Sequence, residues 1–182
     1  IVTGLWRTPV GERFAFDGAH YALTDSPALP KPVQSPVPLI VGGGGPQRTP
    51  QLAARYATEF NIGFVGEEKV RDAFANLHRV CGEEGRDPLT LSLSVALPTI
   101  VAASPAELER RCAAAGIDPG RAGAAAEEGV LVGTPEQVVE KLQRVADLGT
   151  RRVYLQCMDM TDLEHLDLIA AEVLPHVTDT VA

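Results

Sequence analysis

The chain has 182 residues, which is the size of one domain or of a piece of a larger one. It is 45% hydrophobic and 22% charged, so it is able to bury a core. The formal net charge of −8 argues against nucleic-acid binding, because phosphates require clustered cations. No apolar run reaches the ~20 residues of a membrane span. The three cysteines are few and far apart, which excludes a disulfide framework and predicts a reducing, cytoplasmic setting.

The N-terminal part predicts a hairpin followed by a connector. Residues 1–6 are apolar and lack a starting Met, so we expect the end of a helix in a chain that is part of a longer polypeptide. Asp17-Gly18 lies between two short runs with aromatic residues, which predicts a β-hairpin with a two-residue turn. Residues 26–38 include five prolines, which is typical of an extended connector.

Strands alternate with helices in the rest of the chain. Residues 37–41 are a short apolar run, which predicts a strand buried on both faces of a parallel sheet. Ser104 with Glu107, and Thr134 with Gln137, have the spacing of capping boxes. The further elements that we expect are helices at 47–58, 67–81, 105–115, 135–148 and 163–173, and strands at 60–64, 89–101 and 152–156. This alternation predicts an α/β fold with a parallel sheet, and no long linker divides it, so we expect residues 1–182 to form a single unit.

A glycine-rich turn after the strand at 37–41 is the best candidate for a binding site. Glycines allow the backbone to approach a ligand closely, and the following helix directs free N–H groups and its positive dipole end at the same place. Arg48 would add a charge-assisted contact and Thr49 a hydroxyl. The alternative is a tight turn with Arg48 in solvent. The predicted phosphate-binding residues are Gly42, Gly43, Gly44, Gly45, Gln47, Arg48 and Thr49.

Other reactive side chains give weaker signals. No metal site is predicted, because His20, His78, His165 and His176 lie on separate elements. We interpret His78, His165 and His176 as surface or capping residues. No GxSxG elbow occurs, and the sequence assigns no catalytic residue. Arg151 and Arg152 precede a strand, and we interpret them as a solvated surface pair.

Several blocks of the chain form a recognisable series, namely residues 16–21 and 31–34, residues 38–45 with 48–49 and 52–57, and residues 133–138 and 152–156. These blocks resemble the luciferase-like monooxygenases, and within them the probable coenzyme F420-dependent oxidoreductases of actinobacteria. Pro50 departs from the family, which usually has a leucine there. The match begins only after the family's fourth strand.

The resemblance implies a parallel (β/α)8 barrel of the TIM type, of which this chain would be the C-terminal half, strands five to eight. It also implies hydride transfer between coenzyme F420 and a small organic substrate. The loop Gly42–Gly45 and Arg48 match the family's site for the cofactor phosphate. Two alternatives stay open, namely an FMN-dependent monooxygenase of the same superfamily and a non-catalytic fragment that binds phosphates or self-associates.

Half a barrel has consequences for assembly. Its two end strands would be unpaired and an apolar inner face would be open to water. We therefore expect a homo-oligomer, and we expect the chain alone to be inactive as an oxidoreductase.

Overall fold

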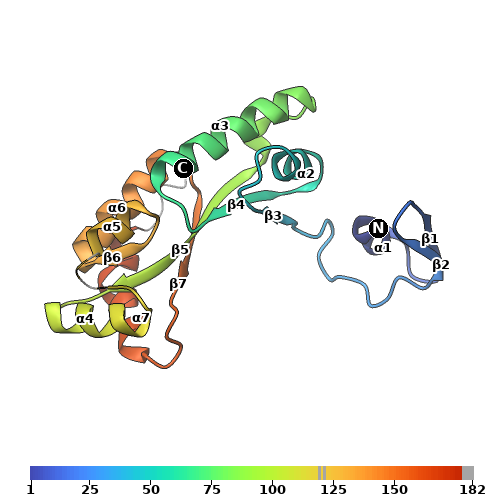
Figure 1. Ribbon diagram of the computed structural model, residues 1–182. Coiled ribbons are helices and arrows are strands. Elements are labelled where there is room, and N and C mark those ends of the chain that lie inside the picture. The colour runs from blue at the N-terminus through green and yellow to red at the C-terminus, as the bar shows by residue number, and fades with distance from the viewer. Residues whose placement is uncertain (119, 121, 178–182) are drawn as a thin grey trace. The chain divides into compact units, whose positions relative to one another are not determined.

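The computed structural model describes residues 1–118, 120 and 122–177. Its contacts divide the chain into two compact units, Ile1–Pro38 and Leu39–Ala182. The boundary lies at the end of the proline-rich connector, and each unit is described by itself (Figure 1). That the whole chain folds as one cooperative unit stays a prediction.

The first unit contains a short helix and a hairpin. Its elements are α1 (Val2–Arg7), β1 (Phe14–Asp17) and β2 (Ala22–Ser26). The two strands are antiparallel, so the predicted hairpin is confirmed. The predicted two-residue turn is wrong, because Asp17 stays in the ladder opposite Ala22 and residues 18–21 form the connection. That longer loop is closed by a bond of 3.0 Å from the Gly18 N–H to the Tyr21 carbonyl.

The second unit is built on a parallel sheet. Its strands are β3 (Ile40–Gly42), β4 (Glu59–Gly63), β5 (Ser92–Val101), β6 (Leu131–Gly133) and β7 (Arg152–Gln156). β5 is the longest and pairs with β4, β6 and β7, whereas β3 pairs with β4. The α/β class with a parallel sheet is therefore confirmed. The sequence-based prediction missed β6, because three residues are too few to show the alternation of a strand.

Helices connect these strands at nearly the predicted places. They are α2 (Arg48–Tyr56), α3 (Glu67–Glu83), α4 (Pro105–Ala114), α5 (Ala122–Glu127), α6 (Pro135–Asp147) and α7 (Leu163–Glu172), with the short 3₁₀ turns η1 (Pro88–Thr90) and η3 (Leu174–His176). Among the helices described in this unit, α5 lacks a counterpart in the sequence-based prediction, because its Ala-rich segment shows no apolar period.

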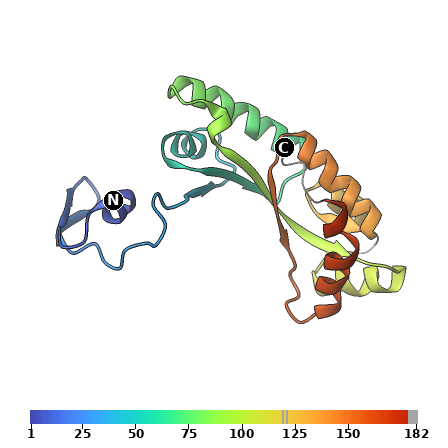
Figure 2. The same ribbon diagram turned by 180° about the vertical axis from the view of Figure 1, so that it is seen from behind.

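One face of the sheet forms the core against the helices. Alternate residues of β5, such as Val95 and Leu97, pack with α2, α3 and α6 in a single apolar cluster. Figures 1 and 2 show these helices on the same side of the sheet. Burial of Leu77 and Phe74 explains why α3 forms, since its apolar residues recur at helical spacing on the covered side.

The opposite face of the sheet is polar, so the expected apolar inner face is wrong. The Tyr154 hydroxyl donates to Glu59 Oε1 at 2.8 Å, and the Arg152 guanidinium pairs with the same carboxylate. The Asn61 amide donates to Ser94 Oγ at 2.9 Å. Arg151 and Arg152 are both exposed, as expected for a surface pair, but Arg152 also pairs with a buried glutamate that the parallel pairing of β4, β5 and β7 brings beside it.

The ends of the sheet are open within the described residues. β3 pairs only with β4, and Ile40 is 47% exposed, so the expectation that this strand is buried on both faces is wrong. β7 pairs only with β5. The described residues thus form an open parallel sheet, and its place as strands five to eight of a barrel stays a proposal. Within this part of the chain no helix is long and apolar enough to cross a membrane.

Candidate functional site

The glycine-rich loop joins β3 to α2. Gly43 has a φ of +137°, which L side chains rarely adopt, and its N–H donates to the Asn61 carbonyl at 3.2 Å. A Cβ at Gly44 would meet no atom within 4 Å, whereas one at Gly45 would lie 3.0 Å from Thr49 Oγ1. The loop is exposed, so its backbone is accessible to a ligand.

The N-terminus of α2 has no cap of its own. Gln47 occupies the N-cap position without a side-chain hydrogen bond, and the first turn has no acidic residue. The backbone N–H groups of Gly44, Gly45, Gln47, Arg48 and Thr49 have no acceptor among the described residues. Free N–H groups at a positive helix end are a ready-made site for an anion.

Two side chains of the first turn add to this donor set. Arg48 is exposed and makes no ion pair or hydrogen bond to any described residue. The Thr49 hydroxyl lies beneath the loop, next to the positions where Gly43 and Gly45 would carry a Cβ. Together they offer a cation and a hydroxyl beside the open N–H groups, which is the chemistry that a phosphate requires.

The loop also forms one wall of a pocket of about 350 Å³. The opposite wall is α3, which contributes Lys69, Asp72, Ala73 and Asn76, and apolar side chains of β4 and the following loop line it as well. A pocket of this size lies within the range of small-molecule sites. The structure therefore places the loop between an open helix end and a cavity.

Some of the seven residues predicted for the site line this pocket and the others lie beside it. Gly43, Gly44 and Gly45 line it. Gly42 lies in β3, Gln47 occupies the N-cap position of α2 without a capping bond, and Arg48 and Thr49 belong to the first turn of α2. Sequence reasoning missed the residues of α3, although their spacing placed them on the polar face of a predicted helix.

Asn76 attaches the loop to α3. Its Nδ2 donates to the Pro46 carbonyl at 2.8 Å, and its Oδ1 accepts from the Arg79 guanidinium at 2.8 Å. Both polar atoms of the amide are therefore engaged. The loop is held at its start by Gly43 and at its end by Pro46, and the glycines between them are left free.

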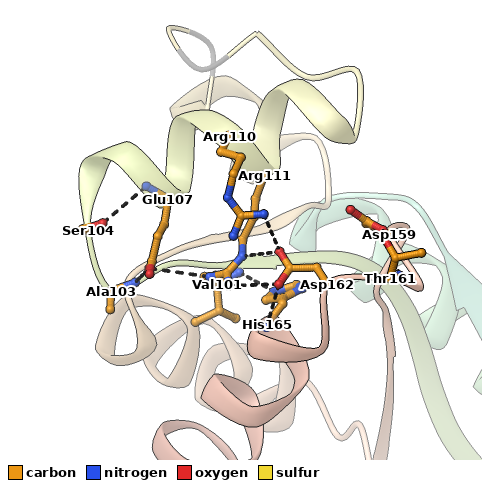
Figure 3. A network of polar contacts seen from close by, with 10 residues as sticks. All are labelled: Val101, Ala103, Ser104, Glu107, Arg110, Arg111, Asp159, Thr161, Asp162 and His165. Atoms are coloured by element: carbon orange, nitrogen blue, oxygen red, sulfur yellow. Dashed lines mark hydrogen bonds and ion pairs between the residues drawn. The ribbon is translucent and has the colours of Figure 1, made fainter.

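A second polar centre joins α4, β5 and α7 (Figure 3). The Arg111 guanidinium donates to the Asp162 carboxylate at 2.9 Å and to the Val101 carbonyl at 2.7 Å. Asp162 also accepts the His165 N–H at 3.0 Å, which caps α7. Arg110 adds a contact of 3.1 Å from the outside. The hydrogen bonds from Arg111 hold the pKa of Asp162 well below its usual range.

His165 is buried, so its interpretation as a surface or capping residue is wrong. Its Nε2 accepts the Val101 N–H at 2.9 Å, which requires a neutral ring. Burial, and then the charge of Arg111, lower the pKa of His165. This histidine completes a closed structural network.

The predicted capping boxes differ from each other. Thr134 and Gln137 form a complete box at α6. At α4, Ser104 Oγ accepts the Glu107 N–H, but Glu107 Oε2 accepts from the Ala103 N–H, one residue earlier than a box requires. A side chain of this length reaches either N–H group, so the sequence spacing does not distinguish them.

Comparisons with known proteins identify the family. The sequence profile described as luciferase-like monooxygenase matches residues 1–127. A coenzyme F420-dependent tetrahydromethanopterin reductase from Methanopyrus kandleri is similar in structure, with a TM-score of 0.71 at 17% identity, and an F420-dependent secondary alcohol dehydrogenase has a TM-score of 0.74 at 20%. Monooxygenase RslO1 from Streptomyces bottropensis has a TM-score of 0.70 at 21%. A search of curated protein sequences finds no match.

These likenesses extend over nearly all of this chain but over only part of each solved structure. They cover 96%, 96% and 94% of this chain, and 60%, 58% and 57% of the reductase, the dehydrogenase and the monooxygenase. At identities this low they show a shared fold. The profile match spans more than half of the sequence, so the chain belongs to the luciferase-like monooxygenase family.

Proposed function

We propose that this chain is part of an oxidoreductase that transfers a hydride between coenzyme F420 and a small organic substrate. The uncapped N-terminus of α2, with the unpaired Arg48 beside the glycine-rich loop, is the observation that carries the proposal. The free N–H groups of Gly44, Gly45 and residues 47–49, together with the Arg48 guanidinium, would hold the cofactor phosphate. F420, when bound, would supply the hydride chemistry. The names of two similar structures include F420.

An FMN-dependent monooxygenase is the second candidate. Similar structures include monooxygenase RslO1 and a Baeyer–Villiger monooxygenase from Pseudomonas putida that was solved in complex with FMN. Both cofactors carry a phosphate on a flexible chain, so the donors at α2 do not distinguish them. The two cofactors differ in their rings, so contacts to the ring would distinguish them.

Binding titrations on the 182-residue chain test the proposal. F420 and FMN are titrated separately and followed by fluorescence, with riboflavin as the probe that lacks the phosphate. We expect F420 to bind more tightly than FMN, and Arg48→Ala to weaken binding of the phosphate-bearing probes ~10- to 100-fold. Tighter binding of FMN would favour the monooxygenase. An unchanged dissociation constant in Arg48→Ala would overturn the phosphate site.

We also propose that the chain self-associates. The open edges of β3 and β7 leave rows of backbone N–H and C=O groups without strand partners among the described residues. Strand-edge pairing between two copies would satisfy them. Light scattering on the purified chain is expected to give a dimer or a larger assembly, and a stable monomer over a wide concentration range would contradict this.

The chain alone is expected to bind cofactor without turnover. It spans about 60% of the length of the F420-dependent structures that it matches. Catalysis would then depend on groups equivalent to the remainder of those structures. Substrate turnover by the purified 182-residue chain with F420 would show that the described sheet is sufficient.

A further inference from the structure

The α3 wall of the pocket has a polar strip that faces the glycine-rich loop. Lys69, Asp72 and Asn76 line the pocket from three successive turns of the helix, at spacings that place them on one face. Between them and the loop lie the apolar side chains of Phe60 and Ile62. The pocket is therefore apolar at its base and charged along one rim.

The three polar residues differ in whether their groups are engaged. Asn76 uses both polar atoms to hold Pro46 and to accept from Arg79. Lys69 and Asp72 are exposed, and neither makes an ion pair or a hydrogen bond to a described residue, although they lie one turn apart. A cation that lines a pocket and remains unpaired is available to an anionic ligand.

We propose that Lys69 is a second phosphate-binding residue, which contacts the ligand from across the pocket. The ligand class is an organic phosphate whose anionic group meets the open backbone N–H groups of Gly44 and Gly45 on one side and the Lys69 ammonium on the other. Its attached chain would lie on Phe60 and Ile62. Asp72, next to Lys69, opposes the negative charge and favours ligands that present a single anionic group at this point. This proposal rests on the proposed phosphate site and extends it to α3.

Substitutions of Lys69 and of its neighbour Asp72 test this role, because we expect them to change the affinity in opposite directions. FMN and inorganic phosphate are the probes, and dissociation constants are measured on the 182-residue chain at low salt. Lys69→Ala is expected to weaken binding about 3- to 10-fold, and Lys69→Arg to retain most of it. Asp72→Asn is expected to tighten binding about 2- to 5-fold, because it removes a like charge near the phosphate.

Arg71 provides the matched control. It is exposed on the same helix, makes no ion pair with a described residue, and does not line the pocket. Arg71→Ala removes the same charge and is expected to change the dissociation constant less than 2-fold. The effect of Lys69→Ala should shrink in 1 M salt, where the screening length falls to about 3 Å.

The outcomes separate this inference from the proposed function. If Arg48→Ala weakens binding and Lys69→Ala equals Arg71→Ala, the α2 site stands and the role of Lys69 is overturned. If only Lys69→Ala weakens binding, the anion lies in the pocket and the α2 site is overturned. If neither variant changes the affinity for FMN or phosphate, both proposals fail. Weakening by both variants, with tightening by Asp72→Asn, supports both.

Discussion

The N-termini of α7 and α2, which belong to the same unit, differ in whether their backbone N–H groups have acceptors. At α7 the Asp162 carboxylate accepts the His165 N–H and is itself fixed by Arg111, so the polar groups are satisfied inside the protein. At α2 the N-cap residue is Gln47, whose side chain makes no capping hydrogen bond, and the glycines and proline before it have no side chain able to cap, so the donors stay open. The difference shows that α7 is capped by its own side chains, whereas α2 leaves donors that water or an anion is able to satisfy.

The largest expected effect concerns the network of Arg111, Asp162 and His165. Asp162→Ala removes the partner of a buried guanidinium and the cap of α7, so it is expected to lower the free energy of unfolding by about 3–5 kcal/mol. Arg111 has only 5% of its side chain exposed, which leaves its charge with little water to solvate it. Urea unfolding followed by circular dichroism measures the change.

Asp159→Ala is the control for that loss. Asp159 lies in the same loop and accepts bonds from the Thr161 N–H at 2.9 Å and the Thr161 hydroxyl at 2.7 Å, but it is half-buried and makes no ion pair with a described residue. Its removal is expected to have a much smaller effect on unfolding. Equal losses in the two variants would show that the network is not a special source of stability.

Substitutions in the glycine-rich loop are expected to change the affinity for the ligand and not the stability of the protein. Gly44→Val places a branched side chain where the cofactor phosphate would approach, and is expected to weaken FMN binding ~10-fold or more. No atom lies within 4 Å of a Cβ at Gly44, so the melting temperature should stay unchanged. Gly45→Val should also weaken binding, with some loss of stability, because its Cβ would press on Thr49 Oγ1.

Gly82→Val controls for the addition of a side chain. Gly82 has equally open space around its Cβ position, and it lies in α3 outside the pocket lining. It is expected to leave the affinity for FMN unchanged. A collapse of the melting temperature in Gly44→Val, with normal affinity of the protein that remains folded, would mean that the loop is purely structural.

The smallest expected effect is the pH dependence of the free energy of unfolding that arises from His165. The pKa of His165 is lowered in the folded state, so below its ordinary value of 6.5 the unfolded chain binds a proton that the folded chain does not. Stability is therefore complete above pH 6.5 and falls as the pH decreases toward the folded pKa. One such group changes the free energy of unfolding by at most about 1.4 kcal/mol per pH unit.

A variant separates His165 from the carboxylates. His165→Gln retains an acceptor for the Val101 N–H but does not titrate, so the loss of stability between pH 6.5 and 5 should become smaller. Asp162 also has a lowered pKa, and its contribution is lost only below its ordinary value of 3.8. An identical slope in wild type and His165→Gln would show that other groups cause the acid sensitivity.

Local sequence patterns predicted the order of the elements and the glycine-rich loop, because both depend on interactions between residues that are close in sequence. Apolar spacing marks α3, and Thr134 with Gln137 marks the start of α6. The contacts of Arg152 and His165 were missed, since their partners, Glu59 and the Val101 N–H, are 93 and 64 residues away in sequence.

The same limit applies to the candidate site. The glycines were identified from their own neighbourhood, but Lys69 joins them only because β3 and β4 pair and bring α3 beside the loop. The apolar character expected of the inner face was wrong for a related reason. Single residues such as Glu59 and Asn61 gain partners only when strands are in register, and a one-strand pattern cannot show this.

The pairing of β5 has a consequence for how this unit opens. Ser94, Val95 and Ala96 have strand partners on both β4 and β7, and residues 99–101 pair with β6. Disrupting β5 therefore breaks three ladders at once, while β3 or β7 can detach by losing one. Amide hydrogens at the centre of β5 should be the last to exchange with deuterated solvent, and those of the two outer strands should exchange through smaller, local openings.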